Sequence, residues 1–263
     1  MSNSPSELYI INQYATPPSL SGITRQYEIG LGLRSLGWKI HIISSDYNLF
    51  TRRYTFLKSF KFSRFKIVDN LKWTWLWTTP YKENNIFRYI NILFFSINLF
   101  IHLTFMGINK KLQRKRNIII LASSPQLPVA WVCLLIAKIL KFKFIFEARD
   151  LWPQVLLDLG KKDENHIIVK VLRKMESQLC KYSNAVIVLS KGSQKHVSRI
   201  GAKKVSWLPN GPDLNTFNFH DVNLRSKEDK FNIIYPGSFG LANGLDNVVK
   251  AAKLLESYSN IHI

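Results

Sequence analysis

The sequence has 263 residues, of which 46% are hydrophobic, and its 37 lysines and arginines against 17 acidic residues give a net charge of +20. The 17 Phe, 10 Tyr and 7 Trp supply ample apolar surface for a folded core, which excludes intrinsic disorder as the main state. The two cysteines, Cys133 and Cys180, lie in apolar or helical stretches and argue against a disulfide-stapled module or a cysteine zinc site, so a reducing compartment fits best.

Short β-rich runs alternate with longer helical patterns along the chain, which is typical of βαβ units and a parallel sheet. The first strand leads into a predicted helix over 23–36 that ends at Gly37. The predicted strands of this unit span 8–12, 39–44, 117–123, 143–148, 185–190 and 205–208. We therefore expect an α/β fold in which helices flank a Rossmann-like parallel sheet.

A polar stretch over 213–230 is interpreted as an interdomain linker. It divides the chain into a first domain, 1–212, and a second unit, 231–263, in which the pattern predicts a strand, a helix and the start of another strand. A unit of roughly 33 residues is too small to bury a core of its own. We therefore expect the second, Rossmann-like domain to be truncated.

The N-terminal region predicts a cytoplasmic protein. Residues 1–7 lack the basic segment of a signal peptide, and the apolar run over 8–11 is too short for the core of one. The excess of positive charge indicates an anionic partner, either nucleic acid or an acidic membrane surface. No helix-turn-helix, RNP or zinc pattern accompanies the charge, which disfavours nucleic acid.

Residues 89–109 carry no formal charge and are rich in Ile, Leu and Phe, so by length alone the segment could span a membrane. Its polar residues recur at helical spacing on one face. This pattern favours a helix that lies on a surface, and it disfavours a helix that is surrounded by lipid. These residues are Asn91, Asn98, His102 and Asn109.

Basic and indole side chains flank this segment. Basic groups meet lipid phosphates and indoles favour the headgroup zone, so together they predict peripheral contact with the anionic cytoplasmic face of the plasma membrane. The predicted membrane-contact residues are Trp73, Trp75, Trp77, Lys110, Lys111, Arg114, Lys115 and Arg116. Two other interpretations stay open: the helix covers the sheet and the charges are merely solvated, or the helix spans the membrane.

Two stretches of the first domain carry candidate chemistry. The loop over 13–25 contains Gly22 and opens a helix, where free N–H groups favour an anion, although a single glycine is more often a plain turn. The strand over 143–148 leads through Glu147 into Arg149 and Asp150. Because ligands gather at the carboxyl ends of strands in open α/β sheets, a functional role is favoured over a salt bridge between Arg149 and a neighbouring acid.

Two further turns lie on either side of the linker. Asn210 and Gly211 form a turn signal after the last strand of the first domain. In the second unit, a strand-to-helix turn with Gly237, Gly240 and Gly244 is rich enough in glycine to cradle phosphates.

In this order and spacing, the four elements resemble family 4 glycosyltransferases of the GT-B fold, and more closely the bacterial branch that builds capsule, colanic acid or O-antigen and includes N-acetyl-fucosamine transferases. The resemblance rests on the Arg-Asp-Leu-Trp-Pro loop from Arg149, the Pro-Asn-Gly-x-Asp turn from Pro209 and the Gly-x-x-Gly-x-x-x-Gly-Leu turn from Gly237. It implies two Rossmann-like domains that face a cleft, with the acceptor on the first and the nucleotide sugar on the second.

The resemblance also implies the activity: transfer of a sugar, with retention, from a nucleotide sugar to a lipid-linked glycan acceptor, with no metal ion or other cofactor. Glu147, Arg149 and Asp150 would meet the acceptor or the reacting centre, with Asp150 polarising the acceptor hydroxyl. The implied donor-binding residues are Gly22, Asn210, Gly237, Gly240, Asn243 and Gly244.

The sequence departs from the family pattern in three places. Ser238 and Asn243 stand where many members have Arg and Lys, and Arg149 stands where many have His. The downstream pair of glutamates that contacts the donor has no counterpart before Ile263. We therefore expect this chain to be inactive alone and to need another chain that supplies the rest of the second domain. The alternative is a non-catalytic remnant that binds acceptor or membrane.

Overall fold

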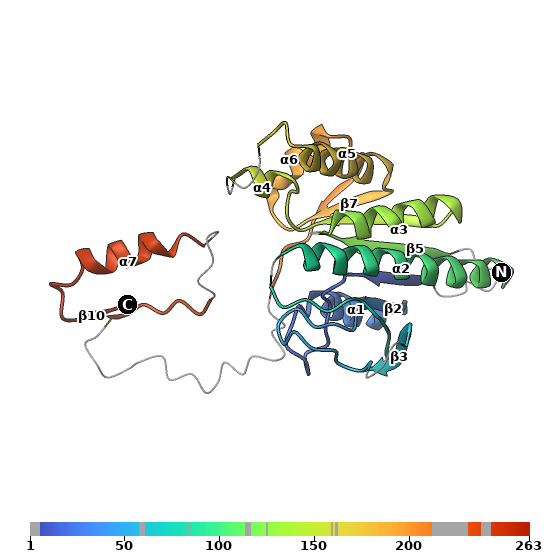
Figure 1. The fold of residues 1–263 in the computed structure, drawn as a ribbon, viewed down its shortest axis with the longest axis horizontal. Helices are drawn as coiled ribbons and strands as arrows, with labels where there is room; N and C mark the ends of the chain where they lie inside the picture. The colour runs from blue at the N-terminus through green and yellow to red at the C-terminus, as the bar shows by residue number, and fades with distance from the viewer. Residues whose placement is uncertain are drawn as a thin grey trace.

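The computed structural model describes residues 6–57, 61–83, 85–113, 117–124, 126–158, 160, 163–211, 231–237 and 243–263 (Figure 1). The predicted linker over 213–230 lies outside these ranges. So do four predicted site residues, Arg114, Lys115, Arg116 and Gly240.

Eight strands form one sheet in the order β3-β4-β2-β1-β5-β6-β7-β8. They are β1 (Glu7–Ile11), β2 (Lys39–Ser45), β3 (Ser63–Val68), β4 (Leu71–Leu76), β5 (Ile118–Ser123), β6 (Lys143–Ala148), β7 (Ala185–Val188) and β8 (Val205–Trp207). Every neighbouring pair is parallel except β3 and β4. The predicted α/β fold with a parallel sheet is therefore confirmed.

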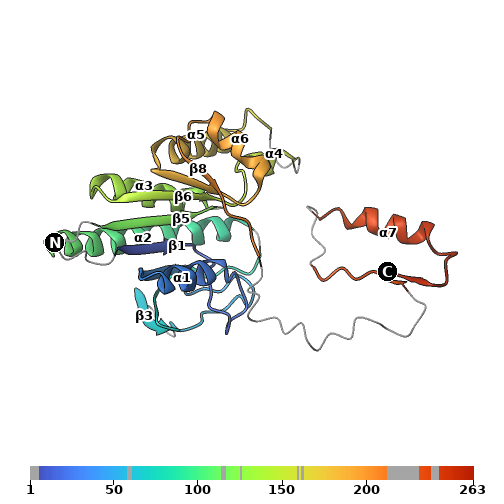
Figure 2. The same ribbon diagram turned by 180° about the vertical axis from the view of Figure 1, so that it is seen from behind.

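Helices cover both faces of the sheet (Figures 1 and 2). On one face, α1 (Arg25–Ser35) packs against the apolar side chains of β1, β2 and β4. On the other face lie α2 (Ile86–Leu112), α3 (Leu127–Ile139), α5 (Ile167–Tyr182) and α6 (Lys191–Arg199), and a short α4 (Gln154–Asp158) follows β6.

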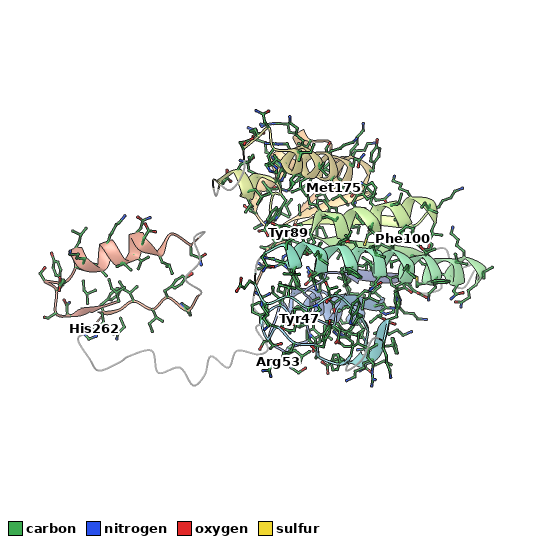
Figure 3. The ribbon with its side chains drawn as sticks, viewed as in Figure 1. Tyr47, Arg53, Tyr89, Phe100, Met175 and His262 are labelled. Atoms are coloured by element: carbon green, nitrogen blue, oxygen red, sulfur yellow. The ribbon has the colours of Figure 1, made fainter. Side chains whose placement is uncertain are left out.

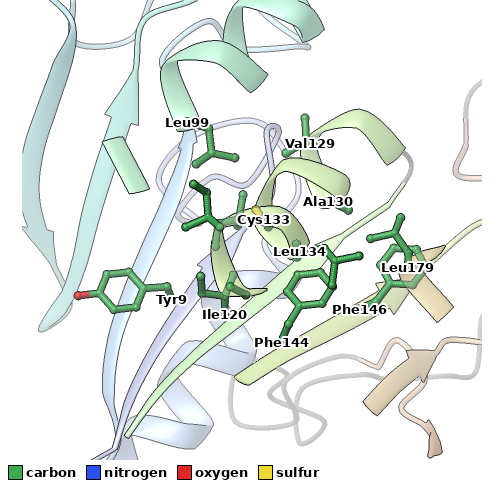
Figure 4. Close-up of a cluster of buried hydrophobic side chains, with 14 of the residues drawn as sticks. Tyr9, Leu99, Ile120, Val129, Ala130, Cys133, Leu134, Phe144, Phe146 and Leu179 are labelled. Atoms are coloured by element: carbon green, nitrogen blue, oxygen red, sulfur yellow. The ribbon is translucent and has the colours of Figure 1, made fainter. Parts of the chain in front are cut away.

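The larger core cluster lies between the sheet and this second layer of helices (Figure 4). Phe144 and Phe146 of β6 are each 1% exposed and meet the helices above them. Strand runs rich in Ile and Phe are typical of a parallel sheet that is covered on both faces. The close-up shows Tyr9, Leu99, Ile120, Val129, Ala130, Cys133, Leu134, Phe144, Phe146 and Leu179 in this cluster.

The hairpin formed by β3 and β4 was not among the predicted strands, and it corrects the interpretation of two tryptophans. Trp73 and Trp75 sit two residues apart on β4, so both point to the face covered by α1. They are 0% and 1% exposed, and their rings stack with centroids 5.2 Å apart. The prediction that they contact a membrane is therefore wrong, because lipid cannot reach a fully buried indole. Trp77, just after β4, is half-buried beside Phe94.

Helix α2 lies across the sheet with its polar residues facing the protein. Asn91 donates to Thr78 Oγ1 at 2.9 Å and accepts from Gln13 Nε2 at 2.6 Å. Asn98 donates to the carbonyl of Trp77 at 2.7 Å. These hydrogen bonds confirm that the polar face lies against a surface, and that surface is the protein itself.

The opposite face of α2 is apolar and exposed. Leu93 is 56% exposed, Ile97 47% and Ile108 45% (Figure 3 labels their neighbours Tyr89 and Phe100 on the same helix). Among the described helices, α2 is the one long and apolar enough to cross a membrane by length and composition, and 33% of its most apolar stretch is buried in the protein.

The second unit contains the predicted strand–helix–strand pattern. Strands β9 (Phe231–Asn232) and β10 (Ile261–His262) pair in parallel, and α7 (Leu245–Leu254) connects them. Apolar side chains of α7 stay open to solvent, with Val249 63% and Leu254 82% exposed. This agrees with the expectation that a single strand–helix–strand unit does not bury a core.

Candidate functional site

The candidate site lies at the carboxyl ends of β1, β5 and β6. The strand order reverses between β1 and β5, because β2 pairs on one side of β1 and β5 pairs on the other. Such a switch point is where open α/β sheets form a crevice for ligands. The loop after β1 and the loop after β6 meet at this edge.

Glu147 is the charged centre of this edge, and its side chain is fully buried. Ser123, its register partner on β5, donates a short hydrogen bond to Glu147 Oε2, and Gln26 Nε2 contacts the same oxygen at 3.4 Å. Arg25 Nε donates to Glu147 Oε1 at 2.8 Å, and the two form an ion pair. Both carboxylate oxygens are therefore engaged by neighbours.

This arrangement corrects the expectation that Glu147 meets an acceptor directly. Its carboxylate has 0% exposure, and hydrogen bonds within the protein already engage both of its oxygens. A buried charge is stable when it is paired and hydrogen-bonded, as this one is. In the structure, the Glu147 carboxylate instead holds the guanidinium of Arg25.

Arg25 is the first residue of α1, and it connects three parts of the first domain. Beyond Glu147, its guanidinium donates to the carbonyl of Leu208 at 2.8 Å, to the carbonyl of Pro209 at 2.9 Å and to Asn210 Oδ1 at 3.1 Å. The turn that contains Asn210 is thus tied to the start of α1. Asn210, predicted to bind donor, has its side-chain oxygen in contact with Arg25.

Arg25 was not among the predicted site residues, although its place near the start of a helix is a signal. A positive charge on the first residue of a helix opposes the helix dipole, which favours anions at that end. An arginine at this position therefore needs a carboxylate from another part of the chain to compensate its charge, and that carboxylate is Glu147.

The loop after β6 is held by Ser124. Its Oγ accepts from the backbone N–H of Arg149 at 2.8 Å and from that of Asp150 at 3.2 Å. The fixed backbone leaves the side chain of Asp150 exposed and that of Arg149 half-buried. Of the three residues predicted to be catalytic, Asp150 is therefore the one most open to a substrate.

Arg149 forms no ion pair with an acid among the described residues, so the alternative of a salt bridge to Glu147 or Asp150 is not seen there. One of its terminal nitrogens, Nη1, is buried and has no hydrogen-bond partner in the described part of the chain. A buried donor without a partner is costly, and an anionic substrate group is one that would satisfy it.

Gly22 has a steric reason to be glycine. A Cβ at this position would collide with the side chain of Thr16, which folds back across the same loop. The loop closes where the backbone N–H of Thr16 donates to the carbonyl of Ile23 at 3.0 Å. Gly22 thus lets the loop after β1 pass close to itself three residues before Arg25.

The other predicted donor-binding residues belong to the second unit. Gly244 has a φ of 59°, a left-handed conformation that suits glycine, and it caps the N-terminus of α7. Gly237 and Asn243 are exposed. A side chain at position 237 would collide with the ring of Tyr235. Their contact with a donor stays a prediction.

No cluster of three or more His, Cys, Asp and Glu side chains suited to a metal occurs within the described ranges. That the reaction needs no metal ion or other cofactor stays a prediction. The groups available for chemistry at this edge are the carboxylate of Asp150, the guanidinium of Arg149 and the backbone of the surrounding loops.

The sequence matches no protein-family model, and no curated protein matches it either. Solved structures do share its fold. Sucrose-phosphate synthase from Thermosynechococcus elongatus matches 95% of this chain with a TM-score of 0.63 at 15% identity. HepE (Alr3699) from Anabaena, in complex with UDP-glucose, matches 98% of it with a TM-score of 0.51 at 9% identity. UGT89C1 from Arabidopsis thaliana, complexed with UDP, matches 99% with a TM-score of 0.51 at 11% identity.

These neighbours are glycosyltransferases of the GT-B class, and the mixed α/β architecture of this chain is theirs. The chain spans 60% of the length of the sucrose-phosphate synthase chain, 68% of HepE and 66% of UGT89C1. At sequence identities of 9% to 15%, the similarity to these structures establishes the fold and nothing finer. Membership of family 4 and of its capsule or O-antigen branch stays a prediction.

Proposed function

We propose that the protein acts in glycosyl transfer, moving a sugar with retention from a nucleotide sugar to a lipid-linked acceptor during the synthesis of a surface polysaccharide. The observation that carries this proposal is the loop after β6, where an exposed carboxylate and an unsatisfied guanidinium stand at the carboxyl edge of a GT-B sheet. Support also comes from HepE and UGT89C1, whose structures contain UDP-glucose and UDP.

The two charged side chains have different tasks in this proposal. Transfer requires an acceptor hydroxyl held against the sugar and a group that polarises its O–H bond. The carboxylate of Asp150 is exposed and suits the second task. The guanidinium of Arg149 suits an anionic group of the acceptor or of the donor diphosphate, because arginine binds phosphate oxygens in a fork geometry.

The departing nucleotide diphosphate needs compensation of its negative charge. In the second unit, the N-terminus of α7 begins right after Gly244, and the unpaired N–H groups of a helix start bind phosphate oxygens. Gly237 and Asn243 flank the same turn. With Ser238 and Asn243 in place of cationic residues, these N–H groups carry most of the proposed donor contact.

The test is turnover by the purified protein together with a chain that supplies the rest of a second domain, with a panel of radiolabelled nucleotide sugars and lipid extracts as acceptor. Transfer of label into the lipid phase is the expected result for the pair of chains, and loss of that transfer in Arg149→Gln would place the reaction at this loop. Absence of transfer and of donor hydrolysis across the panel would contradict the proposal. It would favour the alternative, a chain that binds acceptor or membrane without catalysis.

The exposed apolar face of α2 supports peripheral attachment to the cytoplasmic face of a membrane. Contiguous apolar surface on this scale marks a site of contact with lipid or protein. Lys111 lies exposed in the last turn of the helix, whereas Lys110 beside it is half-buried and paired with Glu7. The net charge of +20 also favours an anionic surface. Flotation with anionic vesicles that weakens as salt is added is the expected behaviour. Equal flotation with neutral vesicles would contradict the proposal that positive charge contributes to membrane attachment.

A further inference from the structure

A cavity of about 460 Å³ lies at the opposite edge of the sheet from the Arg25–Glu147 ion pair. Glu7 and Lys39 begin β1 and β2, and Lys72 is the second residue of β4, so the floor of the cavity is built from the amino ends of strands. The last turns of α2 form its wall through His102 and Lys110. Parallel strands place this edge a full strand length from the loop after β6.

The cavity is basic. It contains three lysines, Lys39, Lys72 and Lys110, and one carboxylate, Glu7. That carboxylate is already engaged, because Lys110 Nζ lies 2.6 Å from Glu7 Oε2 and the hydroxyl of Tyr9 donates to the same oxygen at 3.2 Å. Lys39 and Lys72 are exposed, and neither forms an ion pair in the described part of the chain. The uncompensated charge of the cavity is therefore positive.

Two histidines stand among these lysines. His41 Nε2 shares a hydrogen bond of 2.8 Å with Thr74 Oγ1, and its ring packs between Tyr9 and Phe65. His102 Nε2 is buried and has no hydrogen-bond partner among the described residues. Burial lowers the pKa of both histidines. A buried ring nitrogen without a partner is costly, so a ligand oxygen that accepts from it would be stabilising.

The rim of the cavity is apolar and continuous with the exposed face of α2. Phe105 is 67% exposed on the helix side, and Phe65 is 54% exposed on β3 across the cavity. A soluble anion such as free phosphate gains nothing from aromatic side chains at the mouth of its site. A phosphate attached to hydrocarbon chains can bind the lysines of the cavity through its charge and the aromatic rim through its chains.

We propose that this cavity binds the phosphate headgroup of an anionic phospholipid while the outer face of α2 contacts the acyl chains. The proposal rests on the membrane attachment proposed above and is independent of glycosyl transfer. Lys39 and Lys72 neutralise the phosphate charge, His102 supplies a hydrogen bond, and Phe65 and Phe105 line the path of the chains. Nucleic acid offers phosphates without hydrocarbon, so it leaves the rim and the face of α2 unused.

The first experiment is flotation of the full chain with phosphatidylcholine vesicles that contain phosphatidylglycerol. The variant Lys39→Gln/Lys72→Gln removes two positive charges from the cavity. The matched control is Lys203→Gln/Lys204→Gln, which removes two exposed charges just before β8, at the other lateral end of the sheet. We expect at least a tenfold loss of vesicle binding in the first variant and less than a threefold loss in the control, since a lysine near an anionic surface contributes about 1 kcal/mol.

The outcomes separate the two proposals. Equal losses in both variants would mean that overall charge, not the cavity, attracts the protein, and this would overturn the cavity proposal while leaving membrane attachment in place. No flotation of the unaltered chain would overturn both. Unaltered thermal unfolding in both variants, which the exposure of these lysines leads us to expect, shows that a loss of binding is not a loss of folding.

A second experiment observes the cavity directly through the imidazole NMR signals of His41 and His102, with Lys39→Gln/Lys72→Gln as control. The probes are a short-chain phosphatidylglycerol below its micelle concentration, inorganic phosphate and a single-stranded oligonucleotide. The short-chain lipid should shift both signals in a saturable way, at concentrations at least tenfold below those of inorganic phosphate, and this shift should be lost in the control. Equal response to phosphate, or response to the oligonucleotide alone, would overturn the assignment to a lipid.

Discussion

Arg25 and Glu147 form an ion pair of 2.8 Å that joins the first residue of α1 to the end of β6, with the carboxylate fully buried. The same guanidinium reaches Leu208, Pro209 and Asn210, so one side chain fixes the relation of three loops at the candidate site. The chain leaves the first domain through the turn at Asn210. Arg25 therefore sets the position from which the chain continues toward the second unit.

The losses of stability from removing Arg25 and from removing Glu147 should not be additive. Glu147→Leu leaves a largely buried guanidinium without its carboxylate, and loss of one partner of a buried pair costs about 3–5 kcal/mol. Arg25→Met should cost a similar amount, whereas the double variant should be less destabilised than the sum of the two. Urea unfolding of the four proteins measures this cycle. Additive losses would mean that the ion pair does not couple α1 to β6.

Trp73→Ala should destabilise the fold by about 3–5 kcal/mol, because it removes a fully buried indole that stacks on Trp75. Trp207→Ala is the matched control, since that indole is 44% exposed, and its loss should stay below about 1 kcal/mol. Denaturant unfolding followed by circular dichroism measures both. A small loss for Trp73 would contradict its place in the core and would reopen it as a surface residue.

Most of the parallel sheet was predictable, because strands such as β1, β5 and β6 are short apolar runs between helical segments. The β3–β4 hairpin was not, because Arg64, Lys66 and Lys72 alternate with aromatic residues there. Alternating basic and aromatic residues are typical of a strand with one buried face. The same residue types are also typical of a surface that contacts a membrane. The register of β4 beside β2 is needed to show that the indoles of Trp73 and Trp75 point to the buried face of the sheet.

The candidate site was predictable in its place but not in its roles. Glu147 lies at the end of a strand, and Arg149 and Asp150 follow it directly, so all three had to lie at the carboxyl edge of the sheet. That Glu147 is buried depends on Arg25, which is 122 residues away in the sequence. Contacts between such distant residues leave no local pattern.

The stability of the fold should fall in mild acid because of His41. Burial, together with the positive charges of His102, Lys72 and Lys110, lowers its pKa to about 3, and Glu7 opposes this only in part. The unfolded chain binds a proton near pH 6.5, so the neutral ring stabilises the fold above that pH and the contribution is lost as the pH falls toward 3.

The expected slope of this pH dependence is about 1 kcal/mol per pH unit between pH 6.5 and 5, where few carboxylates titrate. His41→Gln keeps a group that hydrogen-bonds Thr74 and removes the proton site, so its unfolding free energy should vary less with pH. Unfolding series at several pH values measure the difference. Parallel curves for the two proteins would mean that another group governs the acid response.

In the protein complemented by a chain that supplies the rest of a second domain, Asp150→Asn should slow glycosyl transfer by about 100-fold or more if the carboxylate polarises the acceptor hydroxyl. The substitution keeps size and removes charge, and the exposed position leaves the fold intact. Asp163→Asn, an exposed acid near the start of α5, is the matched control and should transfer normally. An unchanged kcat with a raised KM for the acceptor would assign Asp150 to binding.

The outer face of α2 should lose its membrane contact when charge is placed on it. Leu93 and Ile97 lie one helical turn apart and are 56% and 47% exposed, so Leu93→Glu/Ile97→Glu removes apolar contact area without disturbing the core. Losing half-exposed apolar side chains from a lipid contact costs about 1 kcal/mol or more for each, so vesicle binding should fall by at least tenfold. Leu36→Glu is the control, because Leu36 is 75% exposed at the end of α1, on the other face of the sheet. Flotation measures all three proteins, and circular dichroism confirms that they are folded. If Leu36→Glu lost as much binding as the double variant, the membrane would not be contacted by α2 in particular.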